Sequence, residues 1–404
     1  MNMSGQNGEL SVNFFRTALQ CMYVPYYFAM KIPVSLFVGD KTFVEKGDKK
    51  TKTGYKRHYE SAFFSELEKK VDFDIHHLYP WKGKNYSVVR HLVNHFVHPF
   101  LFRKEYKRKR IKHIMFAEES FMLNFFSGKN VIVSCLDVIP LAMPKETSSK
   151  FKLFLKWAYR GMRKADYILA NSYYTKKDIV EYLGIDEHKI SVAYPPVQSH
   201  FTVLEDPPSS FYRAHGLDES KQYVLCVGAL DSKRKNLITA LEAFKKVYFN
   251  NHDINLLLVG YTSVNGSLRR LRKRIKRLGL SGRVRIITNV SDTELVAFYN
   301  LAHIFLFPSL YEGFGLPPLE SMACGTPVVA SNATSIPEAL GEAALFVDPL
   351  DVQGFATAIE RLLLDDQLYD KMVARGLKRA ERFSWKRYAK ETYAVYQKAW
   401  KRRS

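Results

Sequence analysis

The sequence predicts an α/β protein made of two domains, each built around a doubly wound parallel sheet. Strand-length apolar runs alternate along the chain with segments of helical periodicity, which is the pattern of βαβ units. The 404 residues are enough for two cores of ordinary size. Residues 202–210 (TVLEDPPSS) have the composition of a linker. We therefore expect a first domain over residues 1–203 and a second over residues 204–384.

The first domain is expected to begin without an obvious first strand. Residues 10–21 are predicted to form a helix, and residues 4–8 (SGQNG) precede it as a loop. Gly5 and Gly8 are candidates for a phosphate loop, and a flexible terminus is the alternative. Further along, strands are expected at 34–38, 111–117, 131–136, 166–172 and 189–193, with helices at 151–162 and 174–183.

The second domain shows the alternation of strands and helices more regularly. Strands are expected at 223–228, 255–260, 284–288 and 304–307, and another from 328 onward. Helices are expected at 237–247, 267–279, 292–299, 353–364, 366–383 and 385–400.

The stretch 304–331 (IFLFPSLYEGFGLPPLESMACGTPVVAS) reads as strand, tight loop, short helix, turn and strand. Gly313 and Gly315 punctuate the loop, where missing side chains let the backbone approach a ligand closely. Pro317 and Pro318 suit a first helical turn, and Gly325 suits the C-terminal cap. Because the start of a helix carries unpaired N–H groups and partial positive charge, this loop is a natural seat for a diphosphate.

Two carboxylates flank this loop. Glu320, in the first helical turn, could accept hydrogen bonds from ribose hydroxyls, as acidic residues do in dinucleotide sites. Glu312 would then face the group beyond the phosphates. The structural alternatives are that Glu320 is a capping-box acid and Glu312 a solvated loop charge.

EGFGLPPLE, followed by SMACGTPVVASN and IPEALGEAALFVDP, resembles the signature of the family 4 glycosyltransferases, enzymes of the GT-B fold. The resemblance implies two Rossmann-like domains facing a central cleft, with a C-terminal helix (385–404) that crosses back to complete the first domain. It also implies that Glu320 holds the ribose of a nucleotide sugar and that Glu312 contacts the donor sugar. The backbone amides of Phe314, Gly315 and Leu316 would line the sugar–phosphate site.

A second phosphate-contacting loop is expected after Gly228, at the end of the strand 223–228. The resemblance implies an arginine and a lysine here that neutralise the donor diphosphate. Lys235 matches the lysine, while Ala229 stands where many members have the arginine, so we expect Arg234 to replace it. Fixed cations of this kind stabilise the charge that develops on a leaving diphosphate. An exposed surface turn is the alternative for this basic segment.

Other features of the resemblance concern the base and the chemistry. Asn289 and Val290 end the neighbouring strand and would face the nucleobase. Family members retain the anomeric configuration, and the reaction is drawn as a front-side attack in which the departing phosphate takes the acceptor proton. The donor would be a GDP- or UDP-linked hexose of the mannose or glucose type, with no further cofactor. No metal-ligand spacing is present, and His76-His77 is interpreted as a loop pair.

One position departs from the family pattern. Many members have His-Asp at the end of a strand in the first domain, with the histidine reaching the donor sugar. Here SCLDVIPL puts Leu136 in place of that histidine and leaves Asp137. Leucine cannot hydrogen-bond, so the sugar must be oriented by other groups or activity is reduced. The alternative function is therefore a nucleotide-sugar-binding subunit with weak or no catalysis.

The formal net charge of +21 favours anionic partners. The segment FRKEYKRKRIKH is interpreted as a solvated helix face, a site for anionic lipid headgroups, or a contact for nucleic acid. Residues 151–164 are predicted as a basic amphipathic helix that either packs on the core or docks on a membrane. We expect a glycan or lipid-linked acceptor and no nucleic acid partner. The scattered cysteines and the lack of an evident secretory signal favour a cytoplasmic protein, with peripheral association at the inner membrane face left open.

Overall fold

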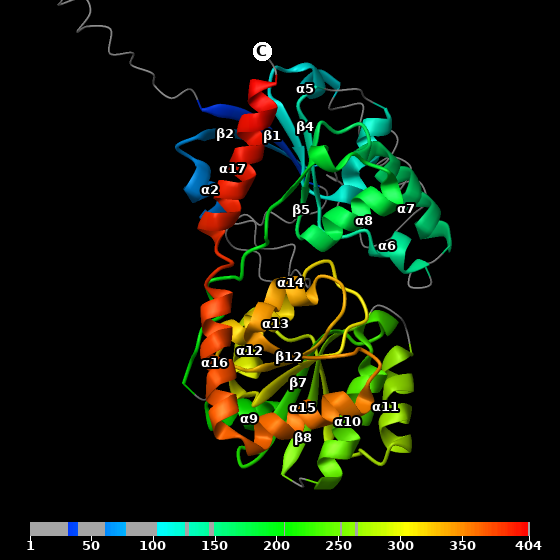
Figure 1. The fold of residues 1–404 in the computed structure, drawn as a ribbon, viewed down its shortest axis with the longest axis vertical. Coiled ribbons are helices and arrows are strands. Elements are labelled where there is room, and N and C mark those ends of the chain that lie inside the picture. Colours follow the sequence, from blue (N-terminus) through cyan, green and yellow to red (C-terminus); the bar gives the residue numbers. More distant parts are fainter. Residues whose placement is uncertain are drawn as a thin grey trace, which may run out of the picture.

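The computed structural model describes residues 31–38, 61–77, 103–125, 129–144, 149–205, 207–250, 253–262 and 266–402. The expected loop 4–8, with Gly5 and Gly8, and the expected helix 10–21 lie outside these residues. Two six-stranded parallel sheets lie one above the other along the long axis, each with helices on both faces (Figure 1). The α/β fold class predicted from the sequence is confirmed.

The first sheet has the strand order β2-β1-β3-β4-β5-β6. The chain runs from β1 to β2 on one side and then returns to place β3 on the other side of β1. Its strands are β1 (Ile32–Val38), β2 (Val71–His77), β3 (Ile111–Ile114), β4 (Val131–Cys135), β5 (Tyr167–Ala170) and β6 (Ile190–Val192).

The second sheet has the order β12-β11-β10-β7-β8-β9. The strands β7, β8 and β9 follow one another on one side, and β10 returns to the other side of β7. The strands are β7 (Gln222–Ala229), β8 (Ile254–Tyr261), β9 (Val284–Thr288), β10 (Ile304–Phe307), β11 (Val328–Ser331) and β12 (Ala344–Val347).

Apolar clusters lie on both faces of each sheet. In the first sheet one face packs on the 3-10 helix η3 and on α7 and α8, and the other on α2 and α17. In the second sheet one face packs on α12, α13 and α14, and the other on α10, α11 and α15. The helices of the first sheet are α2 (Ser61–Leu67), α5 (Arg103–Lys107), η3 (Ala117–Asn124), α6 (Ile139–Ala142), α7 (Ser149–Met162), α8 (Tyr173–Leu183) and η5 (Glu187–Lys189). The others are α9 (Ser209–His215), η6 (Lys233–Lys235), α10 (Leu237–Asn250), α11 (Ser267–Arg277), α12 (Asp292–Leu301), α13 (Leu316–Ala323), α14 (Ile336–Leu340), η7 (Gly341–Ala343), α15 (Val352–Leu364), α16 (Asp366–Ala380) and α17 (Trp385–Lys401).

The last helix, α17, returns from the second domain and packs on the first sheet (Figure 1). Its Tyr396 hydroxyl lies 2.8 Å from Nδ1 of His113 on β3, and the other ring nitrogen of His113 lies 2.8 Å from Ser134 on β4. Burial lowers the pKa of His113 to about 3, so this histidine is a neutral bridge between two strands and α17.

Three details of the first domain differ from the sequence-based expectations. The strand expected at 111–117 ends at Ile114 and is followed by η3. Strand β2 was not predicted, although the alternation of apolar and polar residues in VDFDIHH is typical of a half-buried strand; the expected strands rested on continuous apolar runs. The interpretation of His76-His77 as a loop pair is wrong, since both residues lie in β2.

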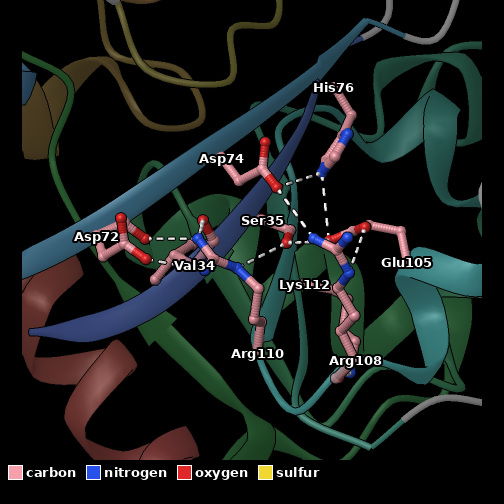
Figure 2. A network of polar contacts seen from close by, with 9 residues as sticks. All are labelled: Val34, Ser35, Asp72, Asp74, His76, Glu105, Arg108, Arg110 and Lys112. Carbon is pink, nitrogen blue, oxygen red and sulfur yellow. Dashed lines mark hydrogen bonds and ion pairs between the residues drawn. The ribbon is translucent and has the colours of Figure 1, made fainter.

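Charged side chains tie the edge strand β2 to α5 and to the start of β3 (Figure 2). Arg110 donates to Asp72 over 2.8 Å and to Oγ of Ser35 over 3.2 Å. Arg108 Nε lies 3.1 Å from Oε2 of Glu105. Edge strands need such devices because one of their sides has no neighbouring strand.

The same network contains three groups with the chemistry of metal ligands. Asp74, His76 and Glu105 bring ligand atoms within 4.8 Å of one another. The guanidinium of Arg108 already lies 3.7 Å from Asp74 and contacts Glu105, so a cation would meet fixed positive charge there (Figure 2). We interpret this cluster as a structural ion-pair network.

Candidate functional site

The predicted donor loop lies where the order of the second sheet reverses. Strand β10 is the neighbour of β7, and the chain reaches β7 first, then β8 and β9, before it returns to β10. In open α/β sheets, the carboxyl ends of two such strands border the crevice that binds ligands. The loop after β7 holds Arg234 and Lys235, and the loop after β10 holds Glu312, so the strand order brings the two predicted loops together.

The loop after β10 turns into α13 at Gly315. This glycine has φ +119°, a conformation that side chains rarely adopt, and it is the N-cap of α13. Pro317 occupies the first turn, where its missing N–H costs no helical hydrogen bond. The helix ends at Ala323, and Gly325 follows the C-cap with φ +80°. The strand–loop–helix–strand pattern predicted for 304–331 is confirmed.

Glu312 is the centre of a buried ion cluster. Its carboxylate accepts from Lys235 Nζ over 2.7 Å and from Arg234 Nη1 over 2.5 Å. Arg234 also donates to the carbonyl of Tyr311 over 3.2 Å. The side chains of Glu312 and Lys235 are only about a tenth exposed. The alternatives of a solvated loop charge for Glu312 and an exposed surface turn for Lys235 are therefore wrong.

Lys235 is held in this cluster by a glycine and an asparagine. Its stem crosses the end of β7 so closely that a Cβ on Gly228 would lie 2.9 Å from Lys235 Cε. Its ammonium lies 4.8 Å from the ring centroid of Phe307. Asn236, in the left-handed conformation with φ +52°, ends η6 and donates to the carbonyls of Pro308 and Pro349 over 3.0 and 2.6 Å. This pins the basic turn onto the loop after β10.

The electrostatics favour an ionised Glu312. Burial alone would raise the pKa of this carboxyl, but Lys235 and Arg234 outweigh it and hold the pKa below its usual range. A compact group of two cations and one anion thus leaves one net positive charge beside the start of α13. Such a site has the chemistry for an anionic ligand with several phosphate oxygens.

Glu320 lies on α13 and is oriented by a tyrosine of α12. The hydroxyl of Tyr299, which is fully buried, donates to Glu320 Oε2 over 2.9 Å. The charge of Glu320 also acts on the ammonium of Lys235. The capping-box alternative for Glu320 does not hold, because Gly315 is the N-cap and has no side chain to complete such a box.

Gly313 is where the first domain meets the donor loop. A Cβ at this residue would lie 2.4 Å from the carbonyl oxygen of Leu136 and 2.8 Å from Cβ of Asp137. The residues directly after β4 therefore lie against Gly313, and the approach of a ligand to this glycine stays a prediction. Asp137 accepts from the amide of Ile139 over 3.1 Å. Burial and the charge of Glu118 raise the pKa of Asp137 to about 6.

Two protein-family models match the chain, one in each domain. The model "Glycosyltransferase Family 4" matches residues 56–201, and the model "Glycosyl transferases group 1" matches residues 210–379. The chain belongs to the family 4 glycosyltransferases. The first model covers most of the first domain and the second model most of the second domain, including both loops of the ion cluster.

Several curated relatives of this glycosyltransferase chain are mannosyltransferases. The serotype-specific mannosyltransferase WbdA of Escherichia coli is 30% identical over 262 residues, which are 62% of this chain and 31% of WbdA. The O-antigen chain mannosyltransferase B of Escherichia coli is 38% identical over 175 residues, 43% of this chain and 45% of that protein. The MMP alpha-(1->4)-mannosyltransferase of Mycolicibacterium hassiacum is 35% identical over 51% of this chain and 50% of its own. The matched region thus spans half or less of these three relatives.

Solved glycosyltransferase structures share the whole fold. A glycosyltransferase from Rickettsia africae superposes with a TM-score of 0.68 at 18% identity, over 92% of this chain and 99% of that one. HepE of Anabaena, solved with UDP and glucose, superposes with a TM-score of 0.66 at 14% identity, over 91% of this chain and 100% of that one. The fold of this family 4 member is GT-B.

The remaining predicted residues lie around the cluster rather than in it. The side chain of Phe314 is buried against Tyr194 and Phe383, so Phe314 contributes its backbone, and not its ring, to the surface of the loop. Leu316 packs on the same core at the first turn of α13. Asn289 and Val290 follow β9, the edge strand, which β8 separates from β7. Asn289 has φ +62°, and Val290 packs on the core.

Sequence reasoning missed the residues that position the site from a distance. Their bonds join segments far apart in the chain, and a single hydroxyl or tyrosine leaves no signature in a sequence. One of them, the serine before α8, was identified as a helix cap from the string DYILANS, but its hydrogen bond to the second domain was not predicted. These residues are Ser172, Thr175, Asp178, Asn236, Tyr299, Tyr311, Thr334, Ser335 and Glu338.

Proposed function

We propose that this protein is a retaining, metal-independent glycosyltransferase. It transfers a hexose of the mannose or glucose type from a GDP- or UDP-linked donor to a glycan or lipid-linked acceptor. Family membership supports the reaction class, and three curated relatives named as mannosyltransferases support the type of sugar.

The single observation that carries the proposal is the ion cluster at the reversal of the second sheet. Lys235 and Arg234 share the carboxylate of Glu312 beside the first turn of α13. A donor diphosphate satisfies both cations and the helix N–H groups at once. The same cations then stabilise the charge that develops on the leaving diphosphate, which is the role a metal ion fills in other transferases.

The proposed roles divide between the two carboxylates. Glu320, held by Tyr299, accepts from the ribose hydroxyls. When phosphates take over Lys235 and Arg234, the carboxylate of Glu312 is released from its ion pairs and turns to the donor sugar. The backbone of Gly313, Phe314, Gly315 and Leu316 lines the sugar–phosphate site. Asn289 and Val290 face the base, and Asp137 faces the sugar from the first domain.

Ligand-dependent thermal stability tests this proposal directly. A ligand that binds only the folded state raises the free energy of unfolding by RT ln(1 + [L]/Kd). We expect a rise in Tm with GDP or UDP and with the corresponding sugar nucleotide, and a smaller rise with a nucleoside at high concentration. In Lys235→Ala, binding of the nucleoside diphosphate should weaken by about 1.5–3 kcal/mol while the nucleoside is unaffected. A wild-type protein that no nucleoside diphosphate stabilises would contradict the proposal.

A catalytically weak nucleotide-sugar-binding subunit is the second candidate, and Leu136 is the observation that favours it. The side chain of Leu136 packs on the apolar cluster under α17 and offers no hydrogen bond to a sugar. Product analysis separates the two functions. Donor binding with neither transfer nor donor hydrolysis would favour the subunit, and release of the nucleoside diphosphate favours the enzyme.

We also propose that the first domain associates with an anionic membrane surface on the cytoplasmic side. Helix α7 buries Leu155, Ala158 and Met162 and exposes two cations and one leucine, Leu153, which is 72% exposed. The two residues that follow the helix are exposed cations as well. Such a face suits the headgroup region of a bilayer that carries a lipid-linked acceptor. The four exposed cations are Lys156, Arg160, Arg163 and Lys164.

A further inference from the structure

The first turns of α8, in the first domain, contact the donor loop of the second domain on both sides of Glu312. The hydroxyls of Ser172 and Thr175 donate to the carbonyl of Gly313 over 2.8 and 3.1 Å. The carboxylate of Asp178 accepts from the hydroxyl of Tyr311. Residues 172, 175 and 178 are three apart, so they lie on one face of the helix. We call these three residues the α8 contact.

The second domain holds the backbone of Glu312 itself. The amide of Glu312 donates to Thr334 Oγ1 over 3.0 Å. The hydroxyl of Ser335 donates to the carbonyls of Glu312 and Phe314 over 2.8 and 3.0 Å. The position of Glu312 is therefore held by its own domain, whereas the groups directly before and after it, the Tyr311 hydroxyl and the Gly313 carbonyl, are bound by the other domain.

A carboxylate of the second domain completes this contact at the start of α8. Glu338 accepts from the amides of Tyr173 and Tyr174 over 2.7 and 3.0 Å. These are unpaired groups of the first helical turn, where a negative charge is favourable. Arg379 on α16 donates to the carbonyl of Glu338 over 2.6 Å and so holds this residue in place. The start of α8 is thus attached to the second domain through a carboxylate, a carbonyl and a phenol.

We propose that the α8 contact couples the approach of the two domains to the geometry of Glu312, with Thr175 and Asp178 as positioning residues. This inference rests on the proposed function, in which Glu312 acts on the donor sugar. When the domains are together, α8 binds the loop on both sides of Glu312 and sets the direction of its side chain. When they separate, the Gly313 carbonyl and the Tyr311 hydroxyl lose these partners, and the loop keeps only the contacts of its own domain, such as those with Thr334, Ser335 and Arg234. Donor binding on the second domain does not require the contact, but the chemical step does.

Thr175 offers the sharpest test, because Val has nearly the same shape and lacks only the hydroxyl. Unlike Ser172, Thr175 does not use its side chain to cap α8. We expect Thr175→Val to lower kcat by about 10-fold, the effect of one lost hydrogen bond at a buried carbonyl, with less than a twofold change in the donor Kd. Thr175→Ser keeps the hydroxyl and should restore most of kcat. The matched control is Thr392→Val on α17, where the hydroxyl is buried without a hydrogen-bond partner among the described residues.

Two results would overturn the inference. One is a kcat in Thr175→Val equal to that of wild type. The other is an equal loss in Thr175→Val and Thr175→Ser, which would assign the effect to packing. If Thr175→Val fails to fold, Tyr311→Phe replaces it as the test. This variant removes the hydroxyl that donates to Asp178 and should show the same loss of kcat at constant donor Kd.

A structural measurement separates this inference from the proposed function. Small-angle scattering of the triple variant Thr175→Val/Tyr311→Phe/Glu338→Ala, which keeps only the Ser172 hydrogen bond, should show a larger radius of gyration than wild type, because these bonds hold the domains together. If wild type turns over no donor, the proposed function fails and scattering alone decides the inference. An unchanged radius of gyration in the triple variant would then overturn it.

Discussion

The ammonium of Lys235 lies in a place that water barely reaches, and its charge is balanced by Glu312 rather than by solvent. A buried ion pair of this kind adds little stability by itself, because desolvation offsets much of the attraction. Removing one partner is a different matter, since the other charge then stays buried and unpaired. Under the proposed function, a diphosphate gives Lys235 and Arg234 new partners without any change in the fold.

For Glu320 we expect a loss of donor affinity that depends on Tyr299. Glu320→Ala should weaken donor binding by about 1.5–3 kcal/mol, the range for a hydrogen bond to a charged group. Tyr299→Phe leaves the carboxylate in place but removes its 2.9 Å partner, so we expect a smaller loss of the same kind. Titration calorimetry with the sugar nucleotide measures both. If the losses in the two single variants add up in the double variant, Tyr299 does not act through Glu320.

For Asp137 the raised pKa predicts the pH dependence of stability. Its folded pKa of about 6 lies above the ordinary value of 3.8 for an aspartate, so the folded state binds the proton more tightly than the unfolded chain does. Ionisation of Asp137 therefore lowers the free energy of unfolding, fully above pH 6. This cost shrinks as the pH falls below 6 and is gone below the unfolded value of 3.8. Asp137→Asn, which keeps an oxygen for the Ile139 amide, should raise Tm at pH 8, with a gain that shrinks towards pH 5. Thermal unfolding of both proteins at each pH cancels the contribution of His113, and a gain that is equal at all pH values would contradict the assignment.

At the scale of elements, the donor loop combines two glycines that are needed for different reasons. Gly315 adopts φ +119°, so its requirement is conformational and lies within the second domain. Gly313 lacks a positive φ, and its requirement is the space taken by Leu136 and Asp137 of the first domain. Gly315 is therefore required for the start of α13, and Gly313 for the close approach of the two domains.

Substituting each glycine by alanine should separate these two roles. Gly315→Ala should lower the free energy of unfolding by about 1–3 kcal/mol, because alanine is strained at this φ. Gly313→Ala should leave Tm nearly unchanged and lower kcat, because the new Cβ keeps the first domain away from the loop. Thermal unfolding and steady-state kinetics on both variants test this. A Tm loss in Gly313→Ala as large as in Gly315→Ala would mean that Gly313 serves the fold of the loop instead.

For the whole molecule, two basic helices lie on the same side, α7 in the first domain and α11 in the second (Figure 1). Helix α11 exposes Arg269, Arg272, Lys273 and Lys276 but no apolar side chain, whereas α7 exposes Leu153 among its cations. No helix in the described part of the chain is long and apolar enough to cross a bilayer.

Vesicle flotation tests the proposed membrane contact of α7. We expect binding to vesicles that contain phosphatidylglycerol and release at high salt, since each cation near an anionic surface contributes about 1 kcal/mol. Changing Lys156, Arg160, Arg163 and Lys164 to Gln should abolish flotation. The matched control removes the same charge from α11 by changing Arg269, Arg272, Lys273 and Lys276 to Gln. This control should keep most of the flotation. Binding that ignores lipid charge and salt, or equal losses in both variants, would speak against a contact made by α7.

How much was predictable from the sequence differs between the second and the first domain. The stretch 304–331 and five of the six strands of the second domain were predicted with small errors at their ends, because buried parallel strands read as apolar runs and glycine and proline mark the loops. The sixth, β12, was not predicted. Strand β2 was missed because it has no continuous apolar run; it is an edge strand, and its apolar and polar residues alternate. Glu312, Lys235 and Glu320 were identified from a resemblance that lies within one local string and one basic turn.

The sequence by itself determined the α/β class, the local strand–loop–helix of the donor loop and the residue types available there, since these depend on neighbours a few positions away. Only the tertiary structure decided which of these residues meet. The order of the second sheet places β7 beside β10 and so joins Lys235 to Glu312, 77 residues apart. The packing of α12 on α13 brings Tyr299 to Glu320, and the approach of the first domain brings α8 to Gly313. Such contacts depend on the packing of whole elements, and the local pattern of the chain carries no record of it.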